Sequence, residues 1–113
     1  MSIGHGILQA VISDQNALYQ AYMNFIEGGG LFVPTQREYK LGDEVFMLLT
    51  LPDESDKIPV AGKIVWITPK GGQGGRQPGI GVQFSERDNG KIRARIENAL
   101  GGLLKSDKPT HTL

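Results

Sequence analysis

The sequence predicts a mainly β domain: a small antiparallel sheet curled towards a barrel, with a short helix after the first strand and a second helix near the C-terminus. Apolar segments of strand length are separated by turns rich in glycine, proline or charged residues. The longest segment carries Gly62 in its body, and such a glycine often marks the bulge or bend by which a small sheet curls. Near the C-terminus, apolar residues recur at helical spacing. The 113 residues are enough for one hydrophobic core.

The first strand is predicted over residues 6–13, which are apolar, partly β-branched and bounded by glycine and by Ser13-Asp14. Either Ser13 or Asp14 is suited to cap a helix over residues 15–23. Apolar residues at i, i+3, i+4 and i+7 form one helical face: Leu18, Ala21, Tyr22 and Phe25. We therefore expect these four side chains to point into the core.

Tyr19 lies off this face, so we expect it to be partly exposed. An exposed tyrosine next to a glycine-rich turn is a good candidate for contact with another protein, because its ring offers a large contact area at low entropic cost. Tyr22 is a second candidate, although it lies on the face that we expect to be buried. We therefore treat Tyr19 and Tyr22 as candidate interaction residues.

Two further strands follow. The first covers residues 30–35 and ends with Pro34, which lacks an amide donor and so belongs at an edge or an end. A polar connector and the turn Leu41-Gly42-Asp43 lead into the second, residues 44–51, which is apolar on both faces. We expect both faces of this second strand to be covered.

The charged segment 52–57 is predicted to be a solvated turn, and residues 58–68 a long strand. Strict alternation places Val60, Ile64 and Trp66 on one side, and Ala61, Lys63, Val65 and Ile67 on the other. Lys63 indicates that its own side faces outward, yet Val65 and Ile67 also need cover. The direction of Trp66 therefore stays open: it either fills the core or anchors an interface, where tryptophan is over-represented.

Residues 69–78, with four glycines and two prolines, are predicted to form a long hairpin loop, and residues 79–84 an alternating strand. Asp88 or Asn89 is suited to cap a final helix. The apolar stripe of that helix is formed by Ile92, Ile96, Leu100 and Leu103. We expect one domain over residues 1–104, followed by a flexible C-terminal tail over residues 105–113, which has no periodicity.

The composition argues against several classes of partner. Lys and Arg together number 12, as do Asp and Glu, so no net field draws the chain to nucleic acid or to an anionic membrane. Cysteine is absent, which excludes disulfides and thiolate sites and fits a reducing compartment. We see no signal peptide and no apolar run of the roughly 20 residues that a spanning helix needs. We expect a cytoplasmic protein.

No set of residues indicates a catalytic or metal site. The glycines at 71–75 precede Arg76 as in a phosphate loop, but Pro78 and a strand follow where a helix N-terminus would be required. His5 and His111 lie near opposite ends of the chain, without a second ligand at metal spacing. The acidic turn at 53–56 has no second set of oxygens beside it in the sequence. We expect no enzymatic activity, no metal and no cofactor.

Three glycines at positions 28–30 separate the aromatic helix from an apolar strand. Glycine adopts positive φ at little steric cost, so the triplet predicts a sharp turn or a close backbone approach. This segment resembles the signature turn of PilZ domains, Asp/Asn-x-Ser-x-x-Gly followed by an apolar strand, with Gly29 and Gly30 as its paired glycines. The acidic position of the motif then falls at Phe25 and the serine position at Glu27.

The resemblance to the PilZ family extends from about residue 6 to residue 104. It includes the turn Leu41-Gly42-Asp43 and the segments Val60-Ala61-Gly62-Lys63-Ile64-Val65-Trp66 and Gly79-Ile80-Gly81-Val82-Gln83-Phe84. It implies a small antiparallel PilZ-type β-barrel with a C-terminal helix.

In family members that bind cyclic di-GMP, the two polar side chains of the turn hold a guanine, and an Arg-x-x-x-Arg on the leader clamps the phosphates. Here Phe25 and Glu27 stand at the polar positions, and no arginine precedes Arg37. The resemblance therefore predicts the fold and argues against binding of this dinucleotide.

Three segments are also similar to the type IV pilus assembly branch of the family: residues 17–23, 28–35 and 105–112. This branch implies a non-enzymatic bacterial adaptor for pilus biogenesis and twitching motility. Its partners are the pilus-extension ATPase PilB and, in some bacteria, the degenerate cyclic di-GMP receptor FimX. We expect Tyr19 and Trp66 at such an interface.

Two other hypotheses stay open. A cyclic di-GMP sensor would use Arg37 and Arg76 in place of the missing leader, because a guanidinium group binds phosphate in bidentate fashion. Alternatively, the chain self-associates through its C-terminal helix. Our preferred interpretation is a monomer that binds other proteins.

Overall fold

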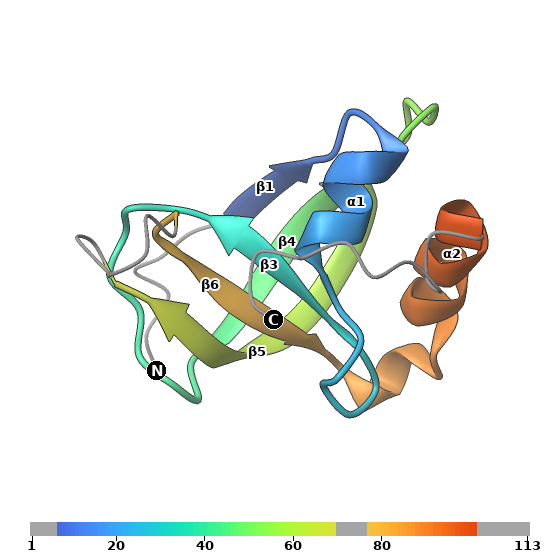
Figure 1. Cartoon of the computed structure of the whole chain (residues 1–113). Helices are drawn as coiled ribbons and strands as arrows, with labels where there is room; N and C mark the ends of the chain where they lie inside the picture. The colour runs from blue at the N-terminus through green and yellow to red at the C-terminus, as the bar shows by residue number, and fades with distance from the viewer. Residues whose placement is uncertain (1–6, 70–76, 102–113) are drawn as a thin grey trace.

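The computed structural model describes residues 7–69 and 77–101, and in this part of the chain it is mainly β (Figure 1). The elements in chain order are β1 (Ile7–Val11), α1 (Gln15–Ala21), β2 (Tyr22–Met23), β3 (Gly30–Pro34), β4 (Glu44–Thr50), β5 (Ile58–Thr68), β6 (Gly79–Phe84), the 3-10 helix η2 (Glu86–Asp88) and α2 (Lys91–Leu100). The predicted fold class is confirmed, and the two-residue strand β2 and the helix η2 are additions to it.

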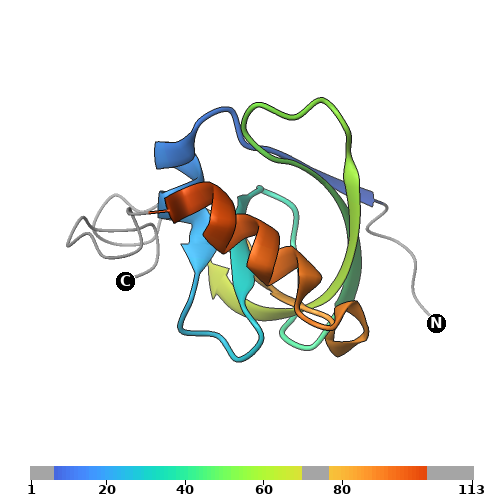
Figure 2. The ribbon, with the colours of Figure 1, turned by 90° about the vertical axis from the view of Figure 1, so that its right-hand side faces the viewer.

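The strands form one sheet in the order β1-β4-β5-β6-β3-β2. All neighbours are antiparallel except β1 and β4, which pair in parallel. The chain between them passes through α1, β2 and β3, which is long enough for the crossover that parallel pairing requires. The sheet curls into an open barrel, and α2 crosses one end of it (Figure 2).

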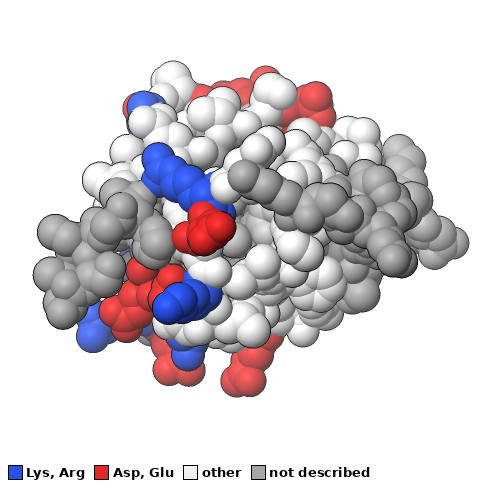
Figure 3. Space-filling model, turned by 90° about the vertical axis from the view of Figure 1, so that its left-hand side faces the viewer, with Lys and Arg blue, Asp and Glu red and all other residues white. Residues whose placement is uncertain are grey.

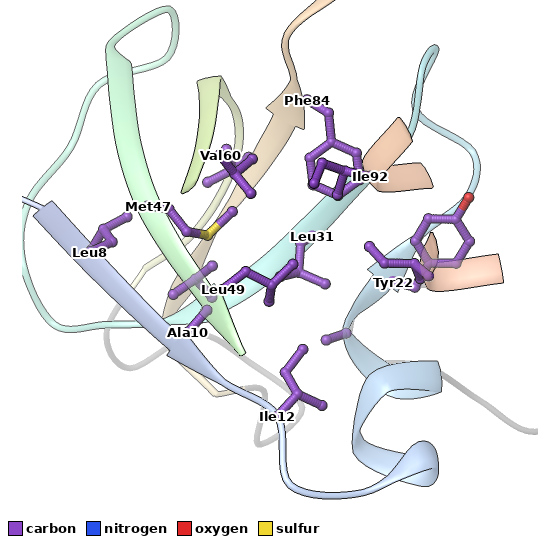
Figure 4. Close-up of a cluster of buried hydrophobic side chains, with 14 of the residues drawn as sticks. Leu8, Ala10, Ile12, Tyr22, Leu31, Met47, Leu49, Val60, Phe84 and Ile92 are labelled. Carbon is purple, nitrogen blue, oxygen red and sulfur yellow. The ribbon is translucent and has the colours of Figure 1, made fainter. Parts of the chain in front are cut away.

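The hydrophobic core fills the space that the curled sheet encloses (Figure 4). Its largest fully buried side chains come from both helices, from strands β3 to β6 and from the residue that follows β4: Leu18, Leu31, Met47, Leu49, Leu51, Ile64, Ile80, Ile96, Leu100 and Val82. The apolar stripe of α2 is buried through Ile92, Ile96 and Leu100, as predicted. α2 is therefore part of the core, while Leu103 lies outside the described residues.

Helix α1 begins as the sequence predicts but ends earlier. The Asp14 carboxylate accepts a hydrogen bond from the Ala17 amide at 2.7 Å, which confirms Asp14 as the cap. Tyr22 has extended backbone angles and pairs with Leu31, so the helix ends at Ala21 and not at Met23. Because the chain leaves the helix here, Phe25 is 44% exposed, and its predicted place in the core is wrong.

The predicted exposure of Tyr19 is also wrong, since only 8% of this residue is exposed. Helix α1 contacts both β3 and α2, so it buries more than one face. The side-chain amide of Gln15 joins the two helices by donating to the carbonyl oxygens of Ala99 at 2.8 Å and Leu100 at 3.1 Å. A helix that packs against two neighbouring elements buries side chains on more than one face, including some that do not belong to its apolar stripe.

Strand β4 is covered on one face only. Val45, Met47 and Leu49 are buried, whereas Phe46 between them is 44% exposed. The sheet is a single curled layer, so the outer face of β4 has no second layer above it among the described elements (Figure 2). The expectation that both faces of this strand would be covered is therefore wrong.

Strand β5 contains a β-bulge that reverses its alternation. Ile64 pairs with Val82, but the next pair is Trp66 with Gly81, so Val65 is an extra residue in the ladder. Ile64 is buried in the core, and Trp66 is turned to the opposite face. The prediction that Val60, Ile64 and Trp66 share one side fails at this point.

The predicted turns have mixed outcomes. Pro34 ends β3, and β5 and β6 pair as the two strands of a hairpin, both as expected. The Asp88 carboxylate accepts a hydrogen bond from the Ile92 amide at 2.8 Å, although the residue at the N-cap position of α2 is Gly90. The loop at 70–76 and the tail at 105–113 lie outside the described residues.

Candidate functional site

The glycine turn, residues 24–29 between β2 and β3, is the sharp turn that the sequence predicts. Gly28 and Gly29 have φ angles of +79° and +88°, where a residue with a Cβ atom is strained. The turn closes with the Gly29 amide donating to the Ile26 carbonyl at 2.7 Å. The third glycine, Gly30, allows the backbone to pack closely against β6, because a Cβ atom there would lie 2.9 Å from the Val82 carbonyl oxygen.

Phe25 projects from the glycine turn and contacts Trp66. The two ring centroids are 5.9 Å apart and the ring planes meet at 63°, an edge-to-face arrangement. The indole N–H of the half-buried Trp66 donates to the Thr68 hydroxyl oxygen at 3.0 Å, which fixes the ring. We call Phe25 and Trp66 the aromatic pair.

The aromatic pair rests on a closely packed part of the sheet. A Cβ atom at Gly81 of β6 would lie 2.7 Å from Trp66 Cβ and 2.8 Å from Met23 Sδ. Met23 is fully buried. A glycine at this position therefore allows Trp66 and Met23 to approach the β6 backbone.

A second set of contacts joins the glycine turn to α2. The Tyr22 hydroxyl donates to Glu97 Oε2 at 2.5 Å, and Arg93 Nε donates to the same oxygen at 3.0 Å. Arg93 Nη2 also donates to the Asn24 carbonyl at 3.5 Å. The aliphatic part of Arg93 packs over Gly29, where a Cβ atom would lie 3.4 Å from it. The C-terminal helix thus holds both ends of the turn.

These contacts shift three pKa values. Burial, and then the hydrogen bond to Glu97, raise the pKa of Tyr22 above the ordinary value for tyrosine. The hydrogen bond from Tyr22, together with the one from Arg93, lowers the pKa of the Glu97 carboxyl. The hydrogen bond to Glu97 raises the pKa of Arg93. At neutral pH the cluster therefore consists of a neutral phenol, a carboxylate and a guanidinium.

We predict that replacing Glu97 by glutamine removes a pH-dependent part of the stability. Because folding lowers the pKa of Glu97, its contribution is present above the ordinary carboxyl value of 4.5 and is lost as the pH falls below it. The side chain is 37% exposed, so we expect a difference of about 1 kcal/mol or less at pH 7. Urea unfolding of wild type and Glu97→Gln at pH 7 and pH 3 should give stabilities that differ at pH 7 and converge at pH 3. An equal difference at both values would contradict this assignment.

The predicted interaction residues differ in what they expose. Tyr19 and Tyr22 are both buried, and the Tyr22 hydroxyl is used within the domain. Trp66 is half-buried on the outer face. Of the three, Trp66 therefore offers the most surface to a partner, and an interaction role for any of them stays a prediction.

The residues at the degenerate nucleotide motif lie together in the glycine turn. Phe25 and Glu27 are exposed, whereas Gly29 and Gly30 are buried. The Glu27 carbonyl accepts a hydrogen bond from the Gln83 side chain at 2.9 Å. The two replacements thus place an aromatic ring and a carboxylate on the surface of the turn.

Sequence reasoning missed Arg93, Glu97 and Gln83. The first two lie on the polar side of a helix whose apolar stripe was recognised, and nothing local indicates that they meet a turn about 70 residues earlier. The alternation of β6 was the one available signal for Gln83, because it places this residue on the side opposite Val82.

One face of the molecule carries charges of both signs, and the described residues contain no metal cluster. On the face shown in Figure 3, Lys and Arg side chains lie beside Asp and Glu, without a large area of one sign. Residues 7–69 and 77–101 contain no group of three or more His, Cys, Asp or Glu side chains placed to hold a metal ion. In the same ranges no helix has the length and apolar character to cross a membrane. His5, Arg76 and His111 lie outside the described residues.

Comparison with known proteins identifies the family. The family model for the PilZ domain matches residues 7–102, which include every described strand and helix. Comparison with the curated proteins gave no match. Because the family model covers most of the sequence, from the first residue of β1 to beyond the end of α2, the chain belongs to the PilZ domain family.

Proposed function

We propose that this PilZ domain is a non-enzymatic adaptor that binds other proteins and does not itself bind cyclic di-GMP. Membership of the family supports a role connected with cyclic di-GMP, either as an adaptor or as a sensor. The adaptor role rests on the glycine turn, where the side chains that hold a guanine in binding relatives are replaced.

The main support for the proposal is the position of the Phe25 side chain in the glycine turn. Its ring packs against Trp66 and presents an apolar surface where a guanine would need hydrogen-bonding groups. Glu27 in the same turn is exposed and carries a negative charge, which repels an anionic dinucleotide. The nearby guanidinium of Arg93 forms an ion pair with the Glu97 carboxylate. The surface therefore suits a protein better than a phosphate ester.

The similarity to the type IV pilus assembly branch leads us to propose the partners. They are the pilus-extension ATPase PilB and a FimX-type regulator, and the place of action is the bacterial cytoplasm. Self-association through α2 is less well supported, because Ile92, Ile96 and Leu100 are buried within the domain. We therefore propose that the chain acts as a monomer.

Titrations with the purified ATPase and with cyclic di-GMP test this proposal. We expect saturable binding of the ATPase and no saturable heat with the dinucleotide up to high micromolar concentration. Tyr19→Ala, in folded protein, tests whether Tyr19 contributes, since native affinity would remove it from the interface. Absence of ATPase binding would contradict the adaptor role, and clear dinucleotide binding would favour the sensor that uses Arg37 and Arg76.

A further inference from the structure

The glycine turn offers an apolar group to solvent. It extends beyond the ends of α1 and β3 in both ribbon views (Figures 1 and 2). Phe25 on this turn is 44% exposed, although it lies beside Trp66, which is itself only half-buried. A phenylalanine fixed in this way can be covered by a partner without a large loss of side-chain entropy.

Within the glycine turn, the one charged side chain is negative. Glu27 is exposed in the same turn, and no ion pair with Glu27 is found among the residues that the structure describes. Arg93, the cation that contacts the turn, is paired with Glu97 at 3.0 Å. A partner that covers Phe25 therefore gains from a positive charge next to its apolar side chain.

The turn is held in place before any partner binds. Gln83 Nε2 donates to the Glu27 carbonyl at 2.9 Å, and the Phe84 amide donates to the Gly29 carbonyl at 3.0 Å. On the other side, Arg93 donates to the Asn24 carbonyl and packs on Gly29. A surface that is already ordered loses less entropy on binding than a flexible loop does.

We propose that Phe25, Trp66 and Glu27 form one docking surface for a protein segment that presents an apolar side chain next to a Lys or Arg, and that Arg93 is a positioning residue for it. This inference rests on the proposed function, because it names the chemistry that the protein partner must present. Phe25 and Trp66 take the apolar side chain, and Glu27 pairs with the cation. Arg93 acts through the backbone of the turn.

The test measures the affinity of purified PilB-type ATPase for variants of the full chain. Phe25→Ala should weaken binding about tenfold or more, and Phe25→Leu should recover part of the loss, because it restores apolar area. Glu27→Lys should weaken binding and reduce its dependence on salt. The matched control is Asp56→Lys, the same charge reversal on the exposed loop between β4 and β5, at the opposite end of the molecule in Figures 1 and 2. It should bind like wild type.

The positioning role of Arg93 has a readout that needs no partner. Trp66 is the only tryptophan, so its fluorescence reports on the aromatic pair alone. Arg93→Met, which keeps the aliphatic part, should change Trp66 emission and weaken binding, whereas Arg93→Lys should restore part of both. Glu27→Gln should weaken binding without changing the emission.

The outcomes separate this inference from the proposed function. If wild type does not bind the ATPase, the proposed function fails and the docking surface fails with it. If wild type binds and Phe25→Ala and Glu27→Lys bind equally well, the adaptor role stands and this surface is wrong. If Arg93→Met leaves both emission and affinity unchanged, Arg93 has no positioning role.

Discussion

Replacing Ile96 by alanine should destabilise the domain by about 2–5 kcal/mol. Ile96 is completely buried, and the helix that carries it covers one end of the barrel (Figure 2). Shortening the side chain leaves a cavity between α2 and the sheet. Urea unfolding followed by circular dichroism measures the change.

Asn98→Ala is the matched control on the same helix. Asn98 is exposed, so its removal should change the free energy of unfolding by no more than about 0.5 kcal/mol. A loss of stability at Ile96 that is no larger than that at Asn98 would show that α2 does not pack on the barrel as described.

Replacing Gly81 by valine should disturb both stability and the aromatic pair. The Cβ atom alone would lie 2.7 Å from Trp66 Cβ and 2.8 Å from Met23 Sδ, so Trp66, Met23 or the β6 backbone must move. Overpacking of this kind costs about 1–3 kcal/mol. A shift of any of these three changes the surroundings of the indole ring, so the emission of Trp66 should change and the affinity for the ATPase should fall.

Gly42→Ala controls for the general cost of losing a glycine. Gly42 has a φ of +93° and nothing within 4 Å of a Cβ atom, so its replacement introduces backbone strain without a clash at the aromatic pair. The strain costs about 1–2 kcal/mol, and Trp66 emission should stay as in wild type. The same emission in wild type and Gly81→Val would contradict the described packing.

The sequence was sufficient for those parts of the fold that depend on local pattern. A short apolar run predicted β3, alternating apolar residues predicted β6, and the spacing of Ile92, Ile96 and Leu100 predicted the buried face of α2. Asp14 was correctly one of two predicted caps. Each of these signals is contained within a few neighbouring residues.

The errors have long-range causes. Helix α1 ends at Ala21 because Tyr22 pairs with Leu31 in another strand, and this pairing turns Phe25 outward. Tyr19 is buried in a helix that contacts α2, although the two helices are far apart in sequence. Local periodicity contains no information on either contact.

The candidate site could be predicted only in part, again because local sequence patterns do not contain long-range contacts. The glycine triplet identified the turn, and Phe25 and Glu27 were recognised as replacements within it. The partner of Phe25 was not predicted, because the bulge at Val65 moves Trp66 to the outer face. The anchoring of the turn by Arg93 and Gln83 required the relative positions of α2, β6 and β2.

The central claim is that the glycine turn takes a protein and not cyclic di-GMP. One measurement tests it most directly: amide and indole NMR spectra of the isotope-labelled chain, recorded during titration with cyclic di-GMP and, separately, with the unlabelled ATPase. We predict that the dinucleotide leaves the Trp66 indole signal and the amide signals of residues 24–29 unchanged, whereas the ATPase shifts or broadens them. Saturable shifts of these signals with the dinucleotide, and none with the ATPase, would contradict it.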